Sequence, residues 1–227
     1  MKNNLVEQKN SAQVFVISAP SGTGKTTLNR RIVASYPAVQ IAVSHTTRSK
    51  RPTEREGIDY FFVNKTEFEA MIQKGEMLEH ALVFGNYYGT SKNSINSLLS
   101  REINVILEID VQGFEQTRLI FPDCTSVFIL PPSILDLWRR LENRATDDLN
   151  TRWRRLITAR EEIKLSGHYQ YFIINDNIEK AYDQLVDIVI CGGSKGLIAK
   201  KNRDHCQLLL NEFDEASWIR DLKEKFK

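Results

Sequence analysis

The sequence has few of the features that mark secreted, membrane-embedded or metal-binding proteins. Its 227 residues include 3 cysteines, Cys124, Cys191 and Cys206, which lie too far apart to form a metal-ligand motif. No apolar run approaches the length of a membrane span, and residues 1–12 lack the apolar core of a signal peptide. We therefore expect a soluble, cytoplasmic protein whose thiols are reduced, with no membrane partner.

An excess of charge of one sign is also missing. The 31 lysines and arginines nearly balance the 29 acidic residues, which leaves a net charge of +2. Proteins that bind nucleic acids through bulk electrostatics carry more positive charge, so we expect no nucleic-acid partner. The 4 histidines have neither metal spacing nor a paired nucleophile, and we assign them no catalytic role. The length suits one large domain, or one core with inserted subdomains.

What the chain does have is a glycine-rich loop between a predicted strand and a predicted helix. The segment from Ala19 to Thr26 reads Ala-Pro-Ser-Gly-Thr-Gly-Lys-Thr, and an apolar run at residues 14–17 precedes it. This order is typical of a phosphate-binding P-loop, in which backbone N–H groups point at phosphate oxygens, although Ala19 replaces the usual first glycine. The following helix adds its positive dipole end, Lys25 can reach the terminal phosphates, and the Thr26 hydroxyl is placed to bind Mg²⁺. We predict that a nucleoside triphosphate is bound by Ala19, Pro20, Ser21, Gly22, Thr23, Gly24, Lys25, Thr26 and Thr27.

Apolar runs of β type alternate with helical patterns along much of the chain. This alternation predicts an α/β fold in three layers, with a central parallel sheet covered by helices. Strands are predicted at residues 14–19, 39–44, 105–110, 126–130 and 171–175. Helices are predicted at residues 25–35, 112–120, 133–144, 151–166 and 178–190.

The pattern changes between residues 44 and 91, where short strands at 60–63 and 77–84 flank another helix. We expect this helix to begin at Thr66, because Thr66 and Glu69 have the spacing of a capping box. The segment therefore predicts an inserted lobe.

Two more segments depart from the alternation. A polar stretch at residues 143–150 lies between two arginine-rich helices, and we expect it to be a mobile lid. After a glycine-rich hinge at 191–196, apolar residues are spaced for an amphipathic helix or two. We expect these helices to pack on the chain's own core or on a second subunit, rather than to form a partner-binding tail.

A second anion site is predicted in the loop that follows the strand at 39–44. Arg48 and Arg51 lie three residues apart in a hydroxyl-rich run, and two guanidinium groups can grip a phosphate through charge-assisted hydrogen bonds. Glu108 and Asp110 come at the end of a core strand, at the edge of the sheet where open α/β folds bind ligands. These residues indicate a P-loop protein that also binds a phosphorylated acceptor.

Together these segments resemble the guanylate kinase family. The phosphate loop is followed, in the family's order, by Ser-His-Thr-Thr-Arg-x-x-Arg-Pro from Ser44, Gly-Asn-Tyr-Tyr-Gly-Thr from Gly85 and Ile-Asp-x-Gln-Gly from Ile109. Ile-Leu-Pro-Pro-Ser and Ile-Asn-Asp complete the set further along the chain. The resemblance covers about residues 13–190.

The resemblance implies a three-part kinase whose closure would exclude water and suppress wasteful ATP hydrolysis. Its parts would be a core P-loop domain at residues 13–43, 91–132 and 167–190, an inserted nucleotide-monophosphate-binding lobe for GMP at 44–90, and a lid region at 133–166. Residues 191–227 would form a C-terminal helical extension outside the resemblance.

The resemblance also implies how the acceptor GMP is held. Guanidinium groups and hydroxyls suit the dianionic 5′-phosphate, and they would come from Ser44, Arg48, Arg51, Tyr60 and Tyr88. Glu79 would accept hydrogen bonds from the guanine N1–H and 2-amino group, and Thr90 would bind O6. Adenine has neither donor, so it would leave a buried carboxylate unpaired and be rejected. Asp110 would reach either the 2-amino edge or the metal shell.

On the donor side, the resemblance implies ATP as the phosphoryl donor together with Mg²⁺. The developing charge would be spread by Lys25 and by three lid arginines, Arg140, Arg144 and Arg155. Asn175 and Asp176 match the segment beside the donor adenine. Phosphoryl transfer needs positioning and charge neutralisation more than covalent chemistry, so we expect no covalent nucleophile.

The sequence thus favours Mg²⁺-dependent transfer of the γ-phosphoryl group of ATP to GMP, giving ADP and GDP. One alternative is a P-loop kinase for another small phosphorylated acceptor, but Glu79 and Thr90 suit guanine. Another is a guanylate-kinase-like binding module, which could have lost Lys25 and the lid arginines that this chain keeps. A nucleic-acid-dependent ATPase fits the near-neutral charge poorly. We expect GMP and ATP as partners and leave open a homodimer.

Overall fold

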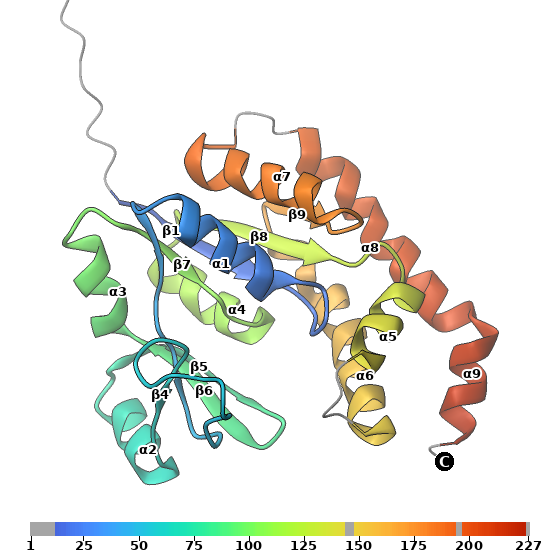
Figure 1. Ribbon diagram of the computed structural model, residues 1–227, viewed down its shortest axis with the longest axis horizontal. Helices are drawn as coiled ribbons and strands as arrows, with labels where there is room; N and C mark the ends of the chain where they lie inside the picture. The colour runs from blue at the N-terminus through green and yellow to red at the C-terminus, as the bar shows by residue number, and fades with distance from the viewer. Residues whose placement is uncertain (1–11, 144–147, 194–196, 226–227) are drawn as a thin grey trace, which may run out of the picture.

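A five-stranded parallel sheet lies at the centre of the structure, a computed structural model that describes residues 12–143, 148–193 and 197–225 (Figure 1). The strand order is β2-β7-β1-β8-β9, and each neighbouring pair is parallel. The strands are β1 (Val14–Ser18), β2 (Val39–Ile41), β7 (Asn104–Leu107), β8 (Thr125–Leu130) and β9 (Tyr171–Ile174). The predicted core strands are confirmed, although two of the predicted ends, at residues 44 and 110, lie three residues too late.

Helices cover both faces of this sheet, because the strands send alternate side chains into two apolar clusters. In β1, Phe15 and Ile17 enter one cluster, whereas Val14 and Val16 enter the other. The first cluster is closed by α1 (Lys25–Ser35) and α7 (Ile178–Ile190). The second is closed by α3 (Lys92–Leu99), α4 (Val111–Ile120), α5 (Ile134–Glu142) and α6 (Leu149–Leu165). The predicted three-layer α/β fold is confirmed.

The segment between the second and seventh strands forms a smaller lobe with its own four-stranded sheet, at the lower left of Figure 1. Its strand order is β4-β3-β6-β5. Phe68 of its helix stacks on Tyr87 of its third strand in the sheet order, with 5.2 Å between the ring centroids. The elements are β3 (His45–Thr46), β4 (Phe61–Phe62), α2 (Lys65–Gln73), β5 (Met77–Val83) and β6 (Asn86–Ser91).

The predicted capping of α2 is wrong. The N-cap is Asn64, whose side-chain oxygen accepts a hydrogen bond from the backbone N–H of Glu67 at 2.9 Å. Asparagine is among the strongest N-cap residues, and it takes the position before Thr66 can do so. The helix therefore begins one residue earlier than predicted, and Thr66 and Glu69 do not form the capping box.

The lid region is described in part. α5 ends at Glu142, two residues earlier than predicted, and α6 begins at Leu149, where Asp148 caps its first turn. Arg144, which we predicted as a lid arginine, lies outside the described residues. A 3₁₀ helix, Ser166–His168, joins α6 to β9.

The C-terminal extension forms α8 (Leu197–Glu215) and α9 (Ser217–Glu224). Leu209, Phe213 and Ile219 are buried in the same apolar cluster as Phe128 of β8. The extension thus packs on the chain's own core, which was one of the two expected arrangements. Among the described helices, none combines the length and the apolarity that crossing a membrane requires.

Candidate active site

The phosphate loop turns sharply between β1 and α1. Gly22 and Gly24 have φ angles of 94° and 101°, a left-handed conformation that favours glycine. A Cβ at Gly24 would also lie only 2.5 Å from Nδ2 of Asn175. Because Gly24 has no side chain to cap α1, the first N–H groups of that helix face the loop, as an anion site requires.

Two predicted arginines reach this loop from the lid helices. The guanidinium group of Arg140 on α5 donates to the backbone carbonyls of Thr23, at 3.2 Å, and Asn175, at 2.8 Å. Arg155 on α6 donates to the hydroxyl of Ser21 at 2.8 Å. The side chain of Asn175 donates to the same Thr23 carbonyl at 2.7 Å. These contacts bring residues of α5, α6 and the end of β9 to the phosphate loop.

The other residues predicted for the nucleotide site, Ala19, Pro20, Thr27 and Asp176, lie in the expected segments. Ala19 and Pro20 are buried where β1 ends, and the Thr23 hydroxyl donates to the Pro20 carbonyl at 2.7 Å. Thr27 is exposed on the first turn of α1, and Asp176 is exposed in the turn before α7.

The hydroxyl of Thr26, predicted to bind Mg²⁺, donates to a carboxylate oxygen of Glu108 at 2.7 Å. Asn29 donates to the other oxygen of Glu108 at 3.2 Å. Glu108 follows β7 directly, at the sheet edge where the sequence predicts ligand binding, but no role was predicted for it. Asp110, to which we did assign a role, caps α4 by accepting the N–H of Gly113 at 2.8 Å.

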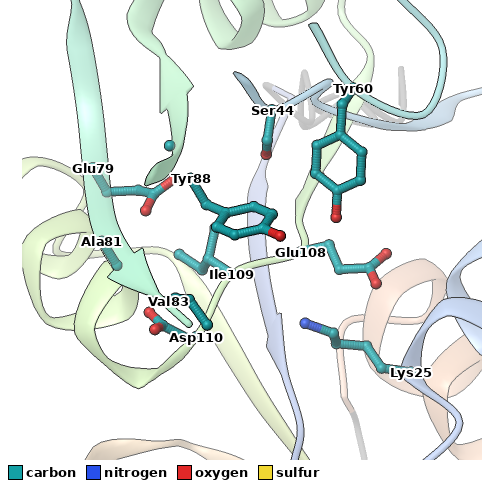
Figure 2. A pocket seen from close by; sticks show the side chains of 11 residues that line it. Lys25, Ser44, Tyr60, Glu79, Ala81, Val83, Tyr88, Glu108, Ile109 and Asp110 are labelled. Carbon is teal, nitrogen blue, oxygen red and sulfur yellow. The ribbon is translucent and has the colours of Figure 1, made fainter. Parts of the chain in front are cut away.

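The acceptor lobe contributes hydroxyl groups to a cavity that Lys25 and Glu108 also line. The hydroxyls of Ser44 and Thr90 lie 3.0 Å apart, and the rings of Tyr60 and Tyr88 meet edge to face with centroids 5.9 Å apart. Burial, together with the nearby carboxylate of Glu108, raises the pKa of Tyr60 to about 12. Tyr60 therefore stays a neutral hydrogen-bond donor at physiological pH. Figure 2 shows the side chains of Ser44, Tyr60 and Tyr88 around the cavity that the ammonium group of Lys25 enters from the opposite side.

Glu79 is distinguished by its deep burial and its raised pKa. It lies on β5 opposite Thr90 of β6 and is only 3% exposed. Burial raises the pKa of Glu79 to about 7; a hydrogen bond with Thr90 opposes this shift, and the charge of Asp110 adds to it. Among the described residues, its buried Oε1 has no hydrogen-bond partner. A buried carboxylate oxygen in this state is poised for a ligand that brings N–H donors.

Two features of the core hold Glu79 in place. Gly113 of α4 leaves it room, since a Cβ there would lie 2.5 Å from Oε2 of Glu79. Gln116, one turn further along α4, donates to the carbonyl of His80 at 2.8 Å and accepts its N–H at 3.1 Å. β5 is an edge strand, so the amide of Gln116 replaces a missing strand partner beside Glu79.

The two predicted acceptor-phosphate arginines are arranged differently from each other. Arg48 donates to a carboxylate oxygen of Glu54 at 2.7 Å, and these side chains are 17% and 13% exposed. The backbone N–H of Arg51 donates to the other oxygen of Glu54 at 2.8 Å, while the residue itself is exposed. Burial opposes but does not outweigh these hydrogen bonds, which lower the pKa of Glu54. Glu54 was not predicted as a site residue, although the sequence places this acid three residues after Arg51.

One cavity of about 170 Å³ is lined by the predicted residues Lys25, Ser44, Tyr60, Glu79, Tyr88 and Asp110, together with Glu108. Lys25 and Glu108 line one end and Glu79 lines the other, with Tyr88 between them and Tyr60 above Glu108 in the view of Figure 2. Arg48 and Arg51 are outside its lining. Within the described residues there is no cluster of three acidic, histidine or cysteine side chains that could hold a metal ion.

A phosphate loop on a three-layer α/β core, with a second polar site in an inserted lobe, defines a P-loop kinase for a small acceptor. Comparisons with known proteins narrow this class. The family model for guanylate kinase matches residues 11–190. The chain therefore belongs to the guanylate kinase family, and it is a nucleoside monophosphate kinase.

Individual relatives agree with the family match. The chain is 46% identical to the guanylate kinase of Coxiella burnetii over 180 residues, which cover 79% of this chain and 87% of that protein. It is 48% identical to the guanylate kinase of Neisseria gonorrhoeae over 176 residues, or 78% and 86% of the two chains. A solved guanylate kinase structure from Anaplasma phagocytophilum aligns with a TM-score of 0.66 at 31% identity, covering 90% of this chain and 95% of that one. The expected family, fold and enzyme class are confirmed.

Proposed function

We propose that this guanylate kinase binds ATP over the phosphate loop and GMP in the cavity, and transfers the γ-phosphoryl group between them. The observation that carries this proposal is the unpartnered, buried oxygen of Glu79 in the same cavity as Lys25. The carboxylate of Glu79 suits a purine that presents two N–H groups, and the ammonium group of Lys25 suits the phosphates of ATP.

Guanine selectivity follows from the protonation state and position of Glu79. In its ionised form the carboxylate accepts hydrogen bonds from the guanine N1–H and 2-amino group. Thr90, whose hydroxyl lies 3.0 Å from that of Ser44, supplies a donor for O6. Adenine offers no N–H at these positions and would leave a buried carboxylate unpaired, a penalty that can reduce turnover by roughly 10⁴-fold.

The acceptor phosphate is bound between the hydroxyls of Ser44, Tyr60 and Tyr88 and the two arginines. Arg48 is already near this position, since its guanidinium carbon lies 5.6 Å from the centre of the Tyr60 ring. Arg51 is exposed, so its side chain has to turn inward when GMP binds. Arginine and hydroxyl donors together neutralise a dianion and keep it close to the donor.

A magnesium ion fits beside the phosphate loop. Thr26 and Glu108 offer two oxygen atoms 2.7 Å apart, and Mg²⁺ is commonly held by one or two protein oxygens together with phosphates and water. When bound, the ion neutralises charge on the transferring phosphoryl group. Glu108 orients the Thr26 hydroxyl, and Asn29 orients Glu108. Asp110 serves the guanine edge, because its carboxylate is fixed at the start of α4 beside Gly113.

The donor end stabilises the transferring group by position and charge. Lys25, Arg140 and Arg155 supply positive charge, and Arg144 is assigned with them from its motif alone. The contact between Asn175 and Thr23 supports a role for Asn175 in shaping the loop, with Asp176 next to the donor adenine. No covalent nucleophile is required, since phosphoryl transfer relies on alignment and electrostatic stabilisation.

We assign the core, GMP-binding lobe and lid their expected roles, with residues 44–90 as the lobe and 133–166 as the lid. We place the enzyme in the cytoplasm, with GMP and ATP as its partners and no membrane partner. The near-neutral charge supports the absence of a nucleic-acid partner. Sedimentation of the purified chain would decide between a monomer and a homodimer.

The test is ADP formation from ATP and Mg²⁺ with GMP, AMP, CMP and UMP offered separately. We expect rapid turnover with GMP alone, and its loss in Lys25→Met while calorimetry still detects GMP binding. Comparable turnover with AMP would contradict the role of Glu79. Unchanged turnover in Lys25→Met would contradict the role of the phosphate loop.

A further inference from the structure

α8 places two acidic side chains against the helices that carry the donor-site arginines. Glu212 contacts α5, which carries Arg140, and Asp214 contacts α6, which carries Arg155. Figure 1 shows the same arrangement, with α8 running past both helices. The family match ends at residue 190, so both acids lie beyond the part of the chain that defines the family.

Glu212 completes the capping of α5 from a distant part of the chain. The backbone N–H groups of Ile134 and Leu135 donate to its two carboxylate oxygens at 2.9 and 3.0 Å. The next N–H, that of Asp136, donates to the hydroxyl of Ser133 at 2.9 Å. The first turn of a helix has no intrahelical partners for these groups, so each one is satisfied from outside the ladder. The negative charge also suits the positive end of the helix dipole.

The capped helix ends at the phosphate loop. α5 has only 9 residues, and Arg140 lies in its last turn, where it donates to the carbonyls of Thr23 and Asn175. A helix this short has little stability of its own, so its position depends on its buried apolar face and on the contacts at its two ends. Glu212 anchors one end of α5, and the guanidinium group of Arg140 reaches the loop from the other.

Asp214 makes a similar but more exposed contact. The guanidinium group of Arg160 on α6 donates to both of its carboxylate oxygens at 3.0 Å. The side chain of Asp214 is 52% exposed, so water screens this ion pair. Phe213, between the two acids, is buried and lies 5.4 Å from Arg160. Of the two acids, Glu212 has the more direct link to a donor-site arginine.

We propose that Glu212 is a positioning residue for phosphoryl transfer, which acts through α5 to hold Arg140 against the phosphate loop. This inference rests on the proposed role of Arg140 at the donor end. It gives the C-terminal extension, which lies outside the family match, a part in the reaction that the core carries out. The acceptor end is not expected to respond, because Glu79 and Thr90 lie on β5 and β6 of the other lobe.

Glu212→Gln tests the inference with little change of shape. The amide keeps one acceptor oxygen but turns an N–H₂ group toward a backbone N–H, so α5 loses part of its cap. A small displacement of a catalytic group lowers the rate strongly, and we expect kcat to fall about tenfold and the KM for ATP to rise. The Kd for GMP, measured by calorimetry without ATP, should stay unchanged. The matched control is Glu215→Gln, an exposed position on the same helix, which should behave as the parent.

A double-mutant cycle separates positioning from general destabilisation. Arg140→Ala alone tests the proposed role of Arg140, and full activity in that variant would refute the role itself. If Glu212 acts through Arg140, adding Glu212→Gln to Arg140→Ala should leave kcat unchanged. A tenfold loss that persists in the Arg140→Ala background would overturn the inference alone. So would parent kinetics in Glu212→Gln, or a parallel weakening of ATP and GMP binding. Should Glu212→Gln fail to fold, Glu212→Asp, which keeps the charge, goes through the same cycle.

Discussion

At the donor end of the cavity Arg140, Arg155 and Thr26 are hydrogen-bonded to other protein groups, whereas at the acceptor end the buried carboxylate of Glu79 keeps one oxygen without a partner among the described residues. Arg140 donates to two carbonyls of the loop region, Arg155 to Ser21, and Thr26 to Glu108. Glu79, in contrast, keeps Oε1 buried without a partner among the described residues. Folding alone organises the first end, and the second is completed by its ligand.

This difference concerns stability as well as binding. A hydrogen bond between protein groups contributes to the free energy of unfolding, whereas a buried carboxylate without its partners lowers that free energy. Functional groups that are buried without partners in the free protein are a common reason why activity and stability conflict. Substitutions at the two ends should therefore reduce activity alike and change the melting temperature in opposite directions.

The largest effect is expected for Glu79→Gln at pH 8. The amide has a single acceptor oxygen for two guanine donors, so kcat/KM for GMP should fall roughly 100- to 1,000-fold. The Tm of the free protein should rise by about 2–4 °C, because a neutral group replaces a buried charge. Steady-state kinetics and thermal unfolding without ligand measure the two changes. A fall in Tm would show that Glu79 is already satisfied in the free protein.

Arg140→Ala is the corresponding change at the donor end. Loss of one charged donor near the transferring phosphoryl group should lower kcat about 100-fold. Here the Tm should fall by about 2–4 °C, because the carbonyls of Thr23 and Asn175 lose their partner. Arg139→Ala is the matched control, since that side chain is 65% exposed on the same helix. An unchanged Tm in Arg140→Ala would remove the contrast between the two ends.

A second contrast, between contacts made within one segment and contacts between distant segments, explains what the sequence could predict. The phosphate loop was predictable because its strand, glycines and lysine are contiguous, so their geometry is set locally by backbone conformation. The roles of Glu108 and Gln116 were not predicted, because their partners, Thr26 and His80, lie 82 and 36 residues away. Such pairs appear only when separate elements are brought together.

The wrong prediction for the start of α2 has the same physical origin. Thr66 and Asn64 both suit an N-cap, and only the path of the chain into α2 selects Asn64. The motif placed Arg51 in the acceptor site, but it could not show that the side chain is exposed before the ligand is bound. The core strands were predicted well, because a strand that is buried on both faces appears in the sequence as a nearly continuous apolar run.

The pH dependence of GMP binding should show the unpaired carboxylate directly. Because burial raises the pKa of Glu79 to about 7, the ionised acceptor is depleted as the pH falls below this value. The Kd for GMP should therefore increase by up to about tenfold between pH 8 and pH 6. Calorimetry across this range is the measurement, and Glu79→Gln corrects for titration of the GMP phosphate. Identical pH profiles in the parent and the variant would exclude Glu79 as the titrating group.

The free protein should show the opposite trend in stability. The pKa of Glu79 is higher in the folded chain than its ordinary value of 4.5, so the carboxyl group stabilises the fold below about pH 4.5. This contribution is lost as the pH rises through 7. Glu162, whose pKa is raised by burial to about 8, acts in the same direction. The difference in Tm between the parent and Glu79→Gln isolates Glu79, and it should change in favour of the variant from pH 5 to pH 8.

Glu54→Gln should produce the smallest effect, at the boundary between the two kinds of site. Glu54 belongs to the acceptor lobe, yet its carboxylate already pairs with Arg48 and with the N–H of Arg51. If this pairing positions Arg48 for the acceptor phosphate, the neutral amide should raise the KM for GMP about threefold and leave kcat unchanged. If Glu54 instead competes with the phosphate for Arg48, the KM should fall. The sign of the change in KM therefore decides whether this part of the acceptor end is organised by folding, as the donor end is, or has to be opened by GMP.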